Sequence, residues 1–242
     1  MSDASKGEPQ YQDDIARMQE MGLQRMGVHA TWAYYDDPKR LLFTMSRYKF
    51  VAKMIDGAES VLEIGCSDGF FSRVVRQSVG ALVAVDFDPT FITSARESVS
   101  QRWPIDFRLH DLREGPVEGR FDAVYALDVL EHIPAGAEEE LFIANAIAPL
   151  TENGVCILGM PSLQSQTFAS AHSKAGHVNC KEQHEFRRLM QRHFANVFMF
   201  SMNDEVVHTG HHAMAHYLIA MCCGKKDNKD CRETFENHCR IV

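Results

Sequence analysis

The chain has 242 residues, 45% of them hydrophobic and 24% charged, a composition that excludes disorder as its main state. With 25 Lys and Arg against 33 Asp and Glu, its formal net charge is −8, so nucleic acid is an unfavourable partner. Its apolar runs are shorter than the ~18 residues of a membrane span. Residues 1–14 lack the apolar stretch of a secretory signal, and we expect none.

The seven cysteines include no C-x-x-C pair, a pattern typical of reduced thiols in a cytoplasmic protein. We expect three parts: a partly disordered N-terminal segment over 1–37, a main domain over 38–223 and a polar tail over 224–242. Apolar spacing predicts a helix over 11–30. A second helix is expected over 38–55, with Pro38 in its first turn and Gly57 beyond its end.

From residue 61 onward, short apolar strands alternate with helices, the pattern of βαβ units. The strands are expected at 61–65, 81–87, 105–111, 121–129, 154–161, 196–202 and 215–223, and the helices at 69–79, 89–99, 138–150 and 181–194. No helix separates the last two strands, so the final one is expected to be antiparallel. The predicted fold is α/β: a Rossmann-like, seven-stranded, mostly parallel sheet with an antiparallel last strand, helices on both faces and an N-terminal helical lid.

The first predicted strand ends in a glycine-rich turn, EIGCSDG, from Glu63 to Gly69. Such a turn lets the backbone approach a ligand and presents free N–H groups at the start of the next helix. The second strand ends in Asp86, where a carboxylate accepts hydrogen bonds from ribose hydroxyls. Together these features indicate a nucleoside-binding crevice at the carboxyl ends of the strands.

The glycine spacing distinguishes between nucleoside ligands. A dinucleotide turn requires G-x-G-x-x-G, whereas Ser67 stands at the second glycine position here. The forms E-x-G-x-x-x-G and V-D-x-D-P, followed by H-D-L at 110–112 and L-D-V-L-E-H-I-P at 127–134, resemble the class I S-adenosylmethionine-dependent methyltransferases. The resemblance covers residues 40–223 and agrees with the predicted number of strands.

That resemblance implies a cofactor, S-adenosylmethionine, and a set of residues that bind it. They are Arg47, Glu63, Gly65, Cys66, Gly69, Asp86, Phe87, Asp111, Leu112, Leu127 and Asp128. Within this set Arg47 would contact the methionine carboxylate, and Asp86 would hold the ribose. Phe87 would flank the adenine, and Asp111 would read its edge together with the Leu112 backbone.

Transfer of a methyl group to an oxygen also requires a base that takes the acceptor's proton. Eight of the twelve histidines lie between residues 172 and 216. Our candidate catalytic bases lie in loops after predicted strands: His132, His177 and His208.

A metal-assisted route stays open beside this one. The spacing Asp128-x-x-Glu131-His132, with His177 supplied later, resembles the magnesium-dependent O-methyltransferases of the ubiquinone pathway and the small-RNA 2′-O-methyltransferases. Those proteins commonly have Glu at the first position, and the D-V-L-E-H-I form also occurs in metal-free relatives. The candidate ligands for Mg or Mn are therefore Asp128, Glu131, His132 and His177.

Polar residues over 160–166 and 203–205 suit a hydroxyl-rich acceptor. The C-terminal half resembles methyltransferases that modify sugars of bacterial surface polysaccharide, so we expect a small-molecule acceptor, a sugar or sugar-nucleotide hydroxyl. The alternatives are a metal-assisted O-methyltransferase acting on another small metabolite or an RNA end, an NAD-dependent dehydrogenase, and a non-catalytic nucleoside-binding module.

Overall fold

The computed structural model describes residues 7–226, and its centre is one eight-stranded sheet in the order β3-β2-β1-β4-β5-β8-β6-β7. The strands are β1 Ser60–Ile64, β2 Ala81–Asp86, β3 Asp106–Leu109, β4 Phe121–Leu127, β5 Leu150–Pro161, β6 Phe194–Asn203, β7 Val206–His208 and β8 Tyr217–Lys225. The pairs from β3 to β5 are parallel, and β8 is antiparallel to both β5 and β6. The predicted mixed sheet with an antiparallel last strand is confirmed.

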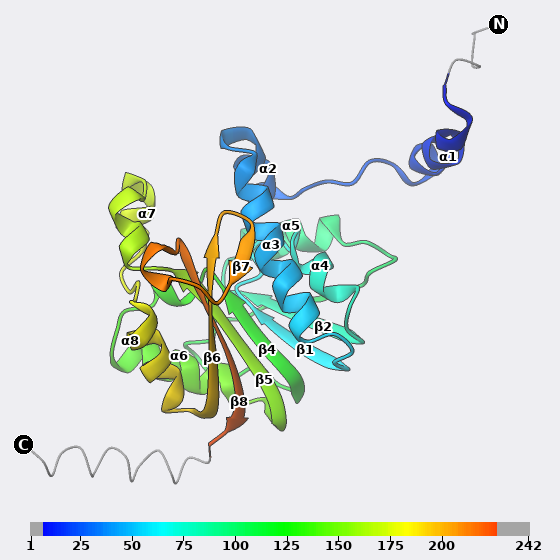
Figure 1. Ribbon diagram of the computed structural model, residues 1–242. Helices are drawn as coiled ribbons and strands as arrows, with labels where there is room; N and C mark the ends of the chain where they lie inside the picture. Colours follow the sequence, from blue (N-terminus) through cyan, green and yellow to red (C-terminus); the bar gives the residue numbers. More distant parts are fainter. Residues whose placement is uncertain (1–6, 227–242) are drawn as a thin grey trace, which may run out of the picture.

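Helices cover both faces of this sheet (Figure 1). They are α1 Gln12–Met21, α2 Val28–Asp36, α3 Lys39–Met54, α4 Ser72–Arg76, α5 Pro89–Ser98, α6 Ala137–Ile147, α7 Ala171–Gly176 and α8 Gln183–Gln191, with 3-10 turns at Pro9–Tyr11, Leu130–His132, Gln164–Phe168 and His212–Met214. One core cluster includes Phe142 of α6 and Phe186 of α8. The other includes Val51 of α3, Val75 of α4 and Ile92 of α5, so each face has its own apolar layer.

Local sequence explains the elements nearest the site. β1 is buried along both faces from Val61 to Ile64, as expected for a central strand of a parallel sheet, and Glu63 is the one polar residue among them. α5 begins where Asp88 accepts a hydrogen bond from Thr90 N, and Pro89 occupies its first turn. Because β1, β2, β4 and β5 are parallel, their carboxyl ends meet at one edge of the sheet. We call this edge the carboxyl edge.

The N-terminal prediction was wrong in one respect, because the helix expected over 11–30 is two helices. Gly22 takes φ 77° and Gly27 takes φ 91°, backbone angles that end a right-handed helix. The segment between them carries α1 away from the sheet, whereas α2 lies against α3 and α5 (Figure 1). Residues 1–6 of the expected disordered start, and 227–242 of the expected tail, lie outside the described residues.

Two further differences concern the second half of the chain. The predicted count of seven strands omits β7, which pairs with β6 through a two-residue turn after Asn203. The polar stretch over 162–180, for which no helix was predicted, contains the 3-10 helix Gln164–Phe168 and α7. Over the described residues, none of the helices combines the length and the apolar character that crossing a membrane requires.

Candidate active site

The glycine-rich turn joins β1 to α4 at the carboxyl edge. Its backbone is fixed by the N–H groups of Gly65 and Cys66, which donate to Val85 O at 2.8 and 3.0 Å. Gly65 takes φ 78°, and a Cβ placed there would overlap the Val129 side chain. The predicted cofactor residues Gly65, Cys66 and Gly69 therefore lie in one tight turn, with the Cys66 side chain buried.

Asp86 is anchored to this turn. Its Oδ2 accepts from Ser67 N at 2.8 Å and its Oδ1 accepts from Asp88 N at 2.9 Å, and the residue is 7% exposed. A carboxylate oxygen has two lone pairs, so each keeps one for a further donor such as a ribose hydroxyl. The next residue, Phe87, is 67% exposed and belongs to the surface, which fits a side chain that flanks a ligand.

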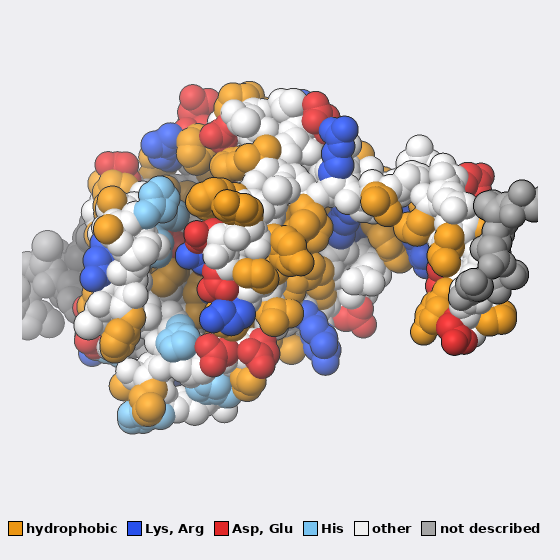
Figure 2. All heavy atoms as spheres, turned by 90° about the horizontal axis from the view of Figure 1, so that it is seen from above, with side chains coloured by type: hydrophobic (Ala, Val, Ile, Leu, Met, Phe, Trp, Pro, Cys, Tyr) orange, Lys and Arg blue, Asp and Glu red, His pale blue; other side chains and the backbone are white. Residues whose placement is uncertain are grey.

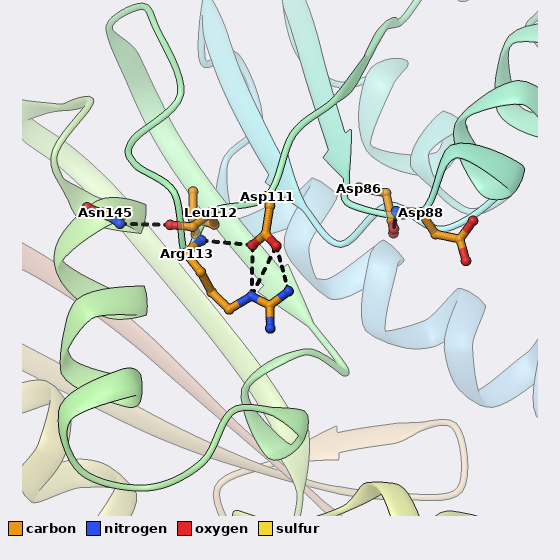
Figure 3. Close-up of polar contacts among 6 residues, drawn as sticks. All are labelled: Asp86, Asp88, Asp111, Leu112, Arg113 and Asn145. Carbon is orange, nitrogen blue, oxygen red and sulfur yellow. Dashed lines mark hydrogen bonds and ion pairs between the residues drawn. The ribbon is translucent and has the colours of Figure 1, made fainter.

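Asp111 lies just beyond the end of β3, the strand beside β2, where Figure 3 shows it facing Arg113. Arg113 Nη2 lies 2.6 Å from Asp111 Oδ2, and this hydrogen bond lowers the pKa of Asp111. The Arg113 guanidinium also lies 5.8 Å from the Phe87 ring centroid. Leu112 is buried, and its carbonyl accepts from Asn145 Nδ2 at 2.7 Å. Sequence reasoning missed Arg113, although a cation two residues beyond Asp111 was a visible signal.

Glu63 lies beneath the turn, fully buried. The Tyr48 hydroxyl on α3 donates to Glu63 Oε1 at 2.8 Å, so this pair ties the lid helix to β1. Burial raises the pKa of Glu63 to about 7, although the hydrogen bond from the Tyr48 hydroxyl opposes that shift. Glu63 thereby joins the strand that carries the glycine turn to α3.

Helix α2 lies over the same turn through contacts that sequence reasoning missed. Asp68, 1% exposed, accepts from Ala30 N at 2.8 Å in the first turn of α2. His29 Nδ1 lies 3.0 Å from Ser67 Oγ. The signal available in the sequence was the carboxylate inside a glycine turn, since a carboxylate is suited to the N-terminus of a helix.

Arg47 on α3 reaches the end of β4, where it contacts Asp128. Its Nη1 lies 2.8 and 2.7 Å from the two carboxylate oxygens of Asp128. The guanidinium carbon stands 3.9 Å above the Tyr217 ring centroid, and Asp128 N donates to the Tyr217 hydroxyl at 3.1 Å. Leu127, just before, is buried. The structure thus brings together Arg47 and Asp128, the first and the last of the predicted cofactor residues along the chain.

Glu131, His132 and His177 form a second group at this edge, with one ligand atom from each within 4.8 Å of the others. His132 Nδ1 donates to Gly176 O and His177 Nδ1 donates to Gln166 Oε1, both at 2.9 Å. Burial lowers the pKa of His177, and the neighbouring His132 adds to this effect. Burial raises the pKa of Glu131, whose Oε2 has no hydrogen-bond partner within residues 7–226.

This group fits a divalent cation. Histidines that bind metal usually donate their other N–H to an oxygen acceptor, as both do here. A buried carboxylate with an unpartnered oxygen would complete the donor set, and two imidazoles favour Mn²⁺ over Mg²⁺. The fourth candidate, Asp128, is not part of the group, because its carboxylate is engaged by Arg47.

The remaining candidate base, His208, is not brought to this group. It lies on β7, where its Nε2 bonds to Asn203 Oδ1 at 2.9 Å and its Nδ1 accepts from Gly210 N at 3.0 Å. Both ring nitrogens are therefore used within the β6–β7 hairpin.

Seen from above, the carboxyl edge shows histidine, acidic and basic side chains gathered between apolar patches (Figure 2). Some of the polar groups expected to face an acceptor are used within the protein. Ser162 is buried and donates to Ala215 O at 2.6 Å, and Ser165 Oγ donates to Ser162 O at 2.7 Å. Leu163 and Phe168 of the same segment are exposed.

The strand order, the glycine turn after β1 and the acid after β2 form the kind of edge at which open α/β sheets bind nucleosides. In agreement, residues 61–154 match the family described as a methyltransferase domain. The chain is 30% identical over 130 residues to a ubiquinone biosynthesis O-methyltransferase of Xanthomonas campestris pv. campestris, a match that covers 51% of this chain and 52% of that protein. The chain thus spans about half the length of the curated relatives that it matches.

Solved structures share this fold at low sequence identity. The N-methyltransferase NodS from Bradyrhizobium japonicum WM9, in complex with S-adenosyl-L-homocysteine, is 19% identical with a TM-score of 0.60, covering 80% of this chain and 91% of that one. The methyltransferase domain of bacterial CtHen1-C is 14% identical with a TM-score of 0.62, covering 75% and 98%. These likenesses establish the fold.

Proposed function

We propose that this protein transfers a methyl group from S-adenosylmethionine to an oxygen of a small polar acceptor. The observation that carries the proposal is the arrangement of the carboxyl edge. There, a glycine turn with its ribose-type acid, Asp86, shares the edge with a buried carboxylate and two histidines, Glu131, His132 and His177. The first part suits a nucleoside and the second suits proton removal or a cation.

Different residues of the first part would contact different portions of the cofactor. The turn at Gly65 and Gly69 lets the backbone approach the methionine portion, Asp86 accepts from the ribose, and Phe87 lies beside the adenine. Arg47 makes both bonds to Asp128 through Nη1, which leaves Nη2 for the methionine carboxylate. When bound, the cofactor supplies a methyl group made electrophilic by its sulfonium.

The second part deals with the proton of the acceptor. Both histidines donate their Nδ1–H to oxygen atoms, so their Nε2 atoms carry lone pairs. An unprotonated Nε2 accepts a hydroxyl proton, and the lowered pKa of His177 keeps it unprotonated at neutral pH. A cation held by Glu131, His132 and His177 would lower the pKa of the acceptor hydroxyl and orient it.

For the acceptor we propose a hydroxyl-bearing small molecule, with a sugar or sugar-nucleotide as the first class to screen. Exposed carboxylates of Asp204 and Glu205 at the β6–β7 turn support such a ligand, because they accept hydrogen bonds from hydroxyls. A second candidate is a phenolic metabolite, favoured by the named activity of the Xanthomonas relatives and by the exposed apolar side chains of Leu163 and Phe168. The charge of −8 disfavours an RNA end.

His177→Ala tests whether cofactor binding and proton removal depend on different residues. We expect S-adenosylhomocysteine to bind with unchanged affinity, because His177 lies outside the glycine turn, and methyl transfer to fall at least a hundredfold. Calorimetry and transfer of labelled methyl to an acceptor found by screening are the measurements. His184→Ala, which removes an exposed histidine on α8, is the matched control. Full activity of the His177 variant would remove it from the mechanism.

Chelation tests the cation separately. EDTA is expected to stop turnover, and Mn²⁺ to restore it more fully than Mg²⁺, because two of the three ligands are imidazoles. If EDTA does not change turnover, the reaction uses no cation and the histidines act as bases alone.

A further inference from the structure

The two histidines of the site are held in the same tautomer. A backbone carbonyl only accepts hydrogen bonds, so the contact from His132 Nδ1 to Gly176 O requires the proton on Nδ1. The His177 Nδ1 contact with Gln166 Oε1 has the same consequence, provided that the amide oxygen and not the amide nitrogen faces the ring.

The surroundings of Gln166 fix that orientation. Its Nε2 lies 3.4 Å from Ser162 O and 3.2 Å from Ser165 Oγ, and a carbonyl oxygen takes only a donor. Ser162 is itself immobilised, since it is fully buried and its hydroxyl donates to Ala215 O. The amide nitrogen therefore points toward Ser162, and Oε1 points toward His177.

Both ring contacts come from one segment, residues 164–177. Its 3-10 helix supplies Gln166, and the end of α7 supplies Gly176 O. Immediately after it, Val178 N and Asn179 N donate to Glu131 O at 2.8 and 3.0 Å. The segment is thus attached to all three members of the group.

We propose that Gln166 is a positioning residue for a divalent-cation site: its Oε1 keeps the His177 proton on Nδ1, so that the Nε2 lone pair is available beside Glu131 and His132. The inference rests on the proposed function, because it takes the group of Glu131, His132 and His177 as the cation site. Gln166 would not bind the cation itself but would orient a residue that does, and this role explains why an amide is found there. An amide oxygen accepts the Nδ1–H without adding charge.

Three variants separate the hydrogen bond from the packing. Gln166→Leu keeps the side-chain volume and removes the acceptor, whereas Gln166→Glu keeps an acceptor toward His177. Gln164→Leu is the matched control, because Gln164 lies in the same 3-10 helix and bonds to neither histidine. The probe is Mn²⁺ alone, titrated into the full metal-free chain and followed by electron paramagnetic resonance.

We expect Gln166→Leu to weaken Mn²⁺ binding by about ten- to a hundredfold, the usual effect of losing a partner behind a metal-binding histidine. Gln164→Leu is expected to bind Mn²⁺ like the wild type. Gln166→Glu, which keeps an acceptor for the Nδ1–H but adds charge and loses the donor to Ser162 O, is expected to bind it more tightly than Gln166→Leu. Equal affinity of Gln166→Leu and the wild type would overturn the inference.

The tautomer is read directly from long-range ¹H–¹⁵N correlation spectra of the metal-free protein at about pH 8, above the ordinary histidine pKa of ~6.5. Wild-type His132 and His177 are expected as Nδ1–H tautomers, and Gln166→Leu is expected to change the pattern of His177 alone. A wild-type His177 protonated on Nε2 would also overturn the inference. If the wild type binds no Mn²⁺, the cation of the proposed function fails, and these spectra alone decide the role of Gln166.

Discussion

Four of the carboxylates near the carboxyl edge differ in their neighbours. Asp86 accepts two backbone N–H groups, whereas Asp111 and Asp128 each face a guanidinium. Glu131 is buried, and one of its oxygens has no partner within the described part of the chain. Of these four, Asp86 alone is held by backbone N–H groups and keeps free lone pairs with no guanidinium bonded to it, the condition for binding hydroxyls.

Asp86→Ala is expected to weaken the binding of S-adenosylhomocysteine at least tenfold, which corresponds to about 1.4 kcal/mol for a hydrogen bond to a charged group. Isothermal titration calorimetry measures the change. Asp88→Ala is the control, since that carboxylate caps α5 through Thr90 N. An Asp86→Ala protein that is folded and binds as tightly as the wild type would refute the ribose assignment.

Among the elements, α3 and α2 are attached to the glycine turn by buried acids. Glu63 on β1 is bonded to Tyr48 on α3, and Asp68 in the turn is bonded to the first turn of α2. When a buried acid bonds to a neighbouring element, protonation or removal of that acid changes the stability of the element. Each of these two hydrogen bonds therefore gives a prediction about stability and not about methyl transfer.

Stability is expected to depend on the protonation of Glu63. Its pKa rises from the ordinary 4.5 to about 7 on folding, so between these values the folded state holds a proton that the unfolded chain has released. Its contribution to the free energy of unfolding is thus complete below pH 4.5 and is lost as the pH rises to about 7, roughly 3 kcal/mol in all.

Glu63→Gln isolates this effect, because the amide keeps the size of the side chain and cannot ionise. Urea denaturation of both proteins between about pH 5 and pH 8 is the measurement. The wild type minus variant difference in unfolding free energy should fall with rising pH and level off above about pH 7. A difference that does not change with pH would contradict the assignment.

Loss of the Asp68 carboxylate is expected to release α2. Asp68→Ala removes the acceptor of Ala30 N, at a cost of about 1 kcal/mol, the usual effect of losing a helix N-terminal acceptor. Hydrogen exchange should accelerate at residues 28–36 and stay unchanged in the central strands. Protection of α2 equal to that of the wild type would show that packing alone holds this helix.

The elements that sequence patterns missed have specific physical causes. The apolar periodicity runs through Gly22 and Gly27, whereas in the structure residues 22–27 are not helical and both glycines have positive φ. The β6–β7 turn contains Asp204-Glu205 where hairpins usually show Asn-Gly or Asp-Gly, so its signal was absent. By contrast, the strands of the parallel sheet were predicted well because their apolar runs are bounded by helices.

Over the whole molecule, the strand ends that build the site could be predicted because parallel strands place their carboxyl ends together. The group of Glu131 and His132 follows from sequence spacing, whereas His177 joins it only through the path of residues 164–177. The contacts of Arg47 with Asp128 and of Gln166 with His177 depend on side-chain directions after long loops. Sequence spacing does not encode those directions.

The central claim is that the carboxyl edge binds S-adenosylmethionine, and calorimetric titration of the full chain with S-adenosylhomocysteine tests it most directly. We predict one site per chain with a dissociation constant in the micromolar range, and no binding of NAD under the same conditions. A folded protein that binds NAD and not S-adenosylhomocysteine would contradict the account and favour a dehydrogenase.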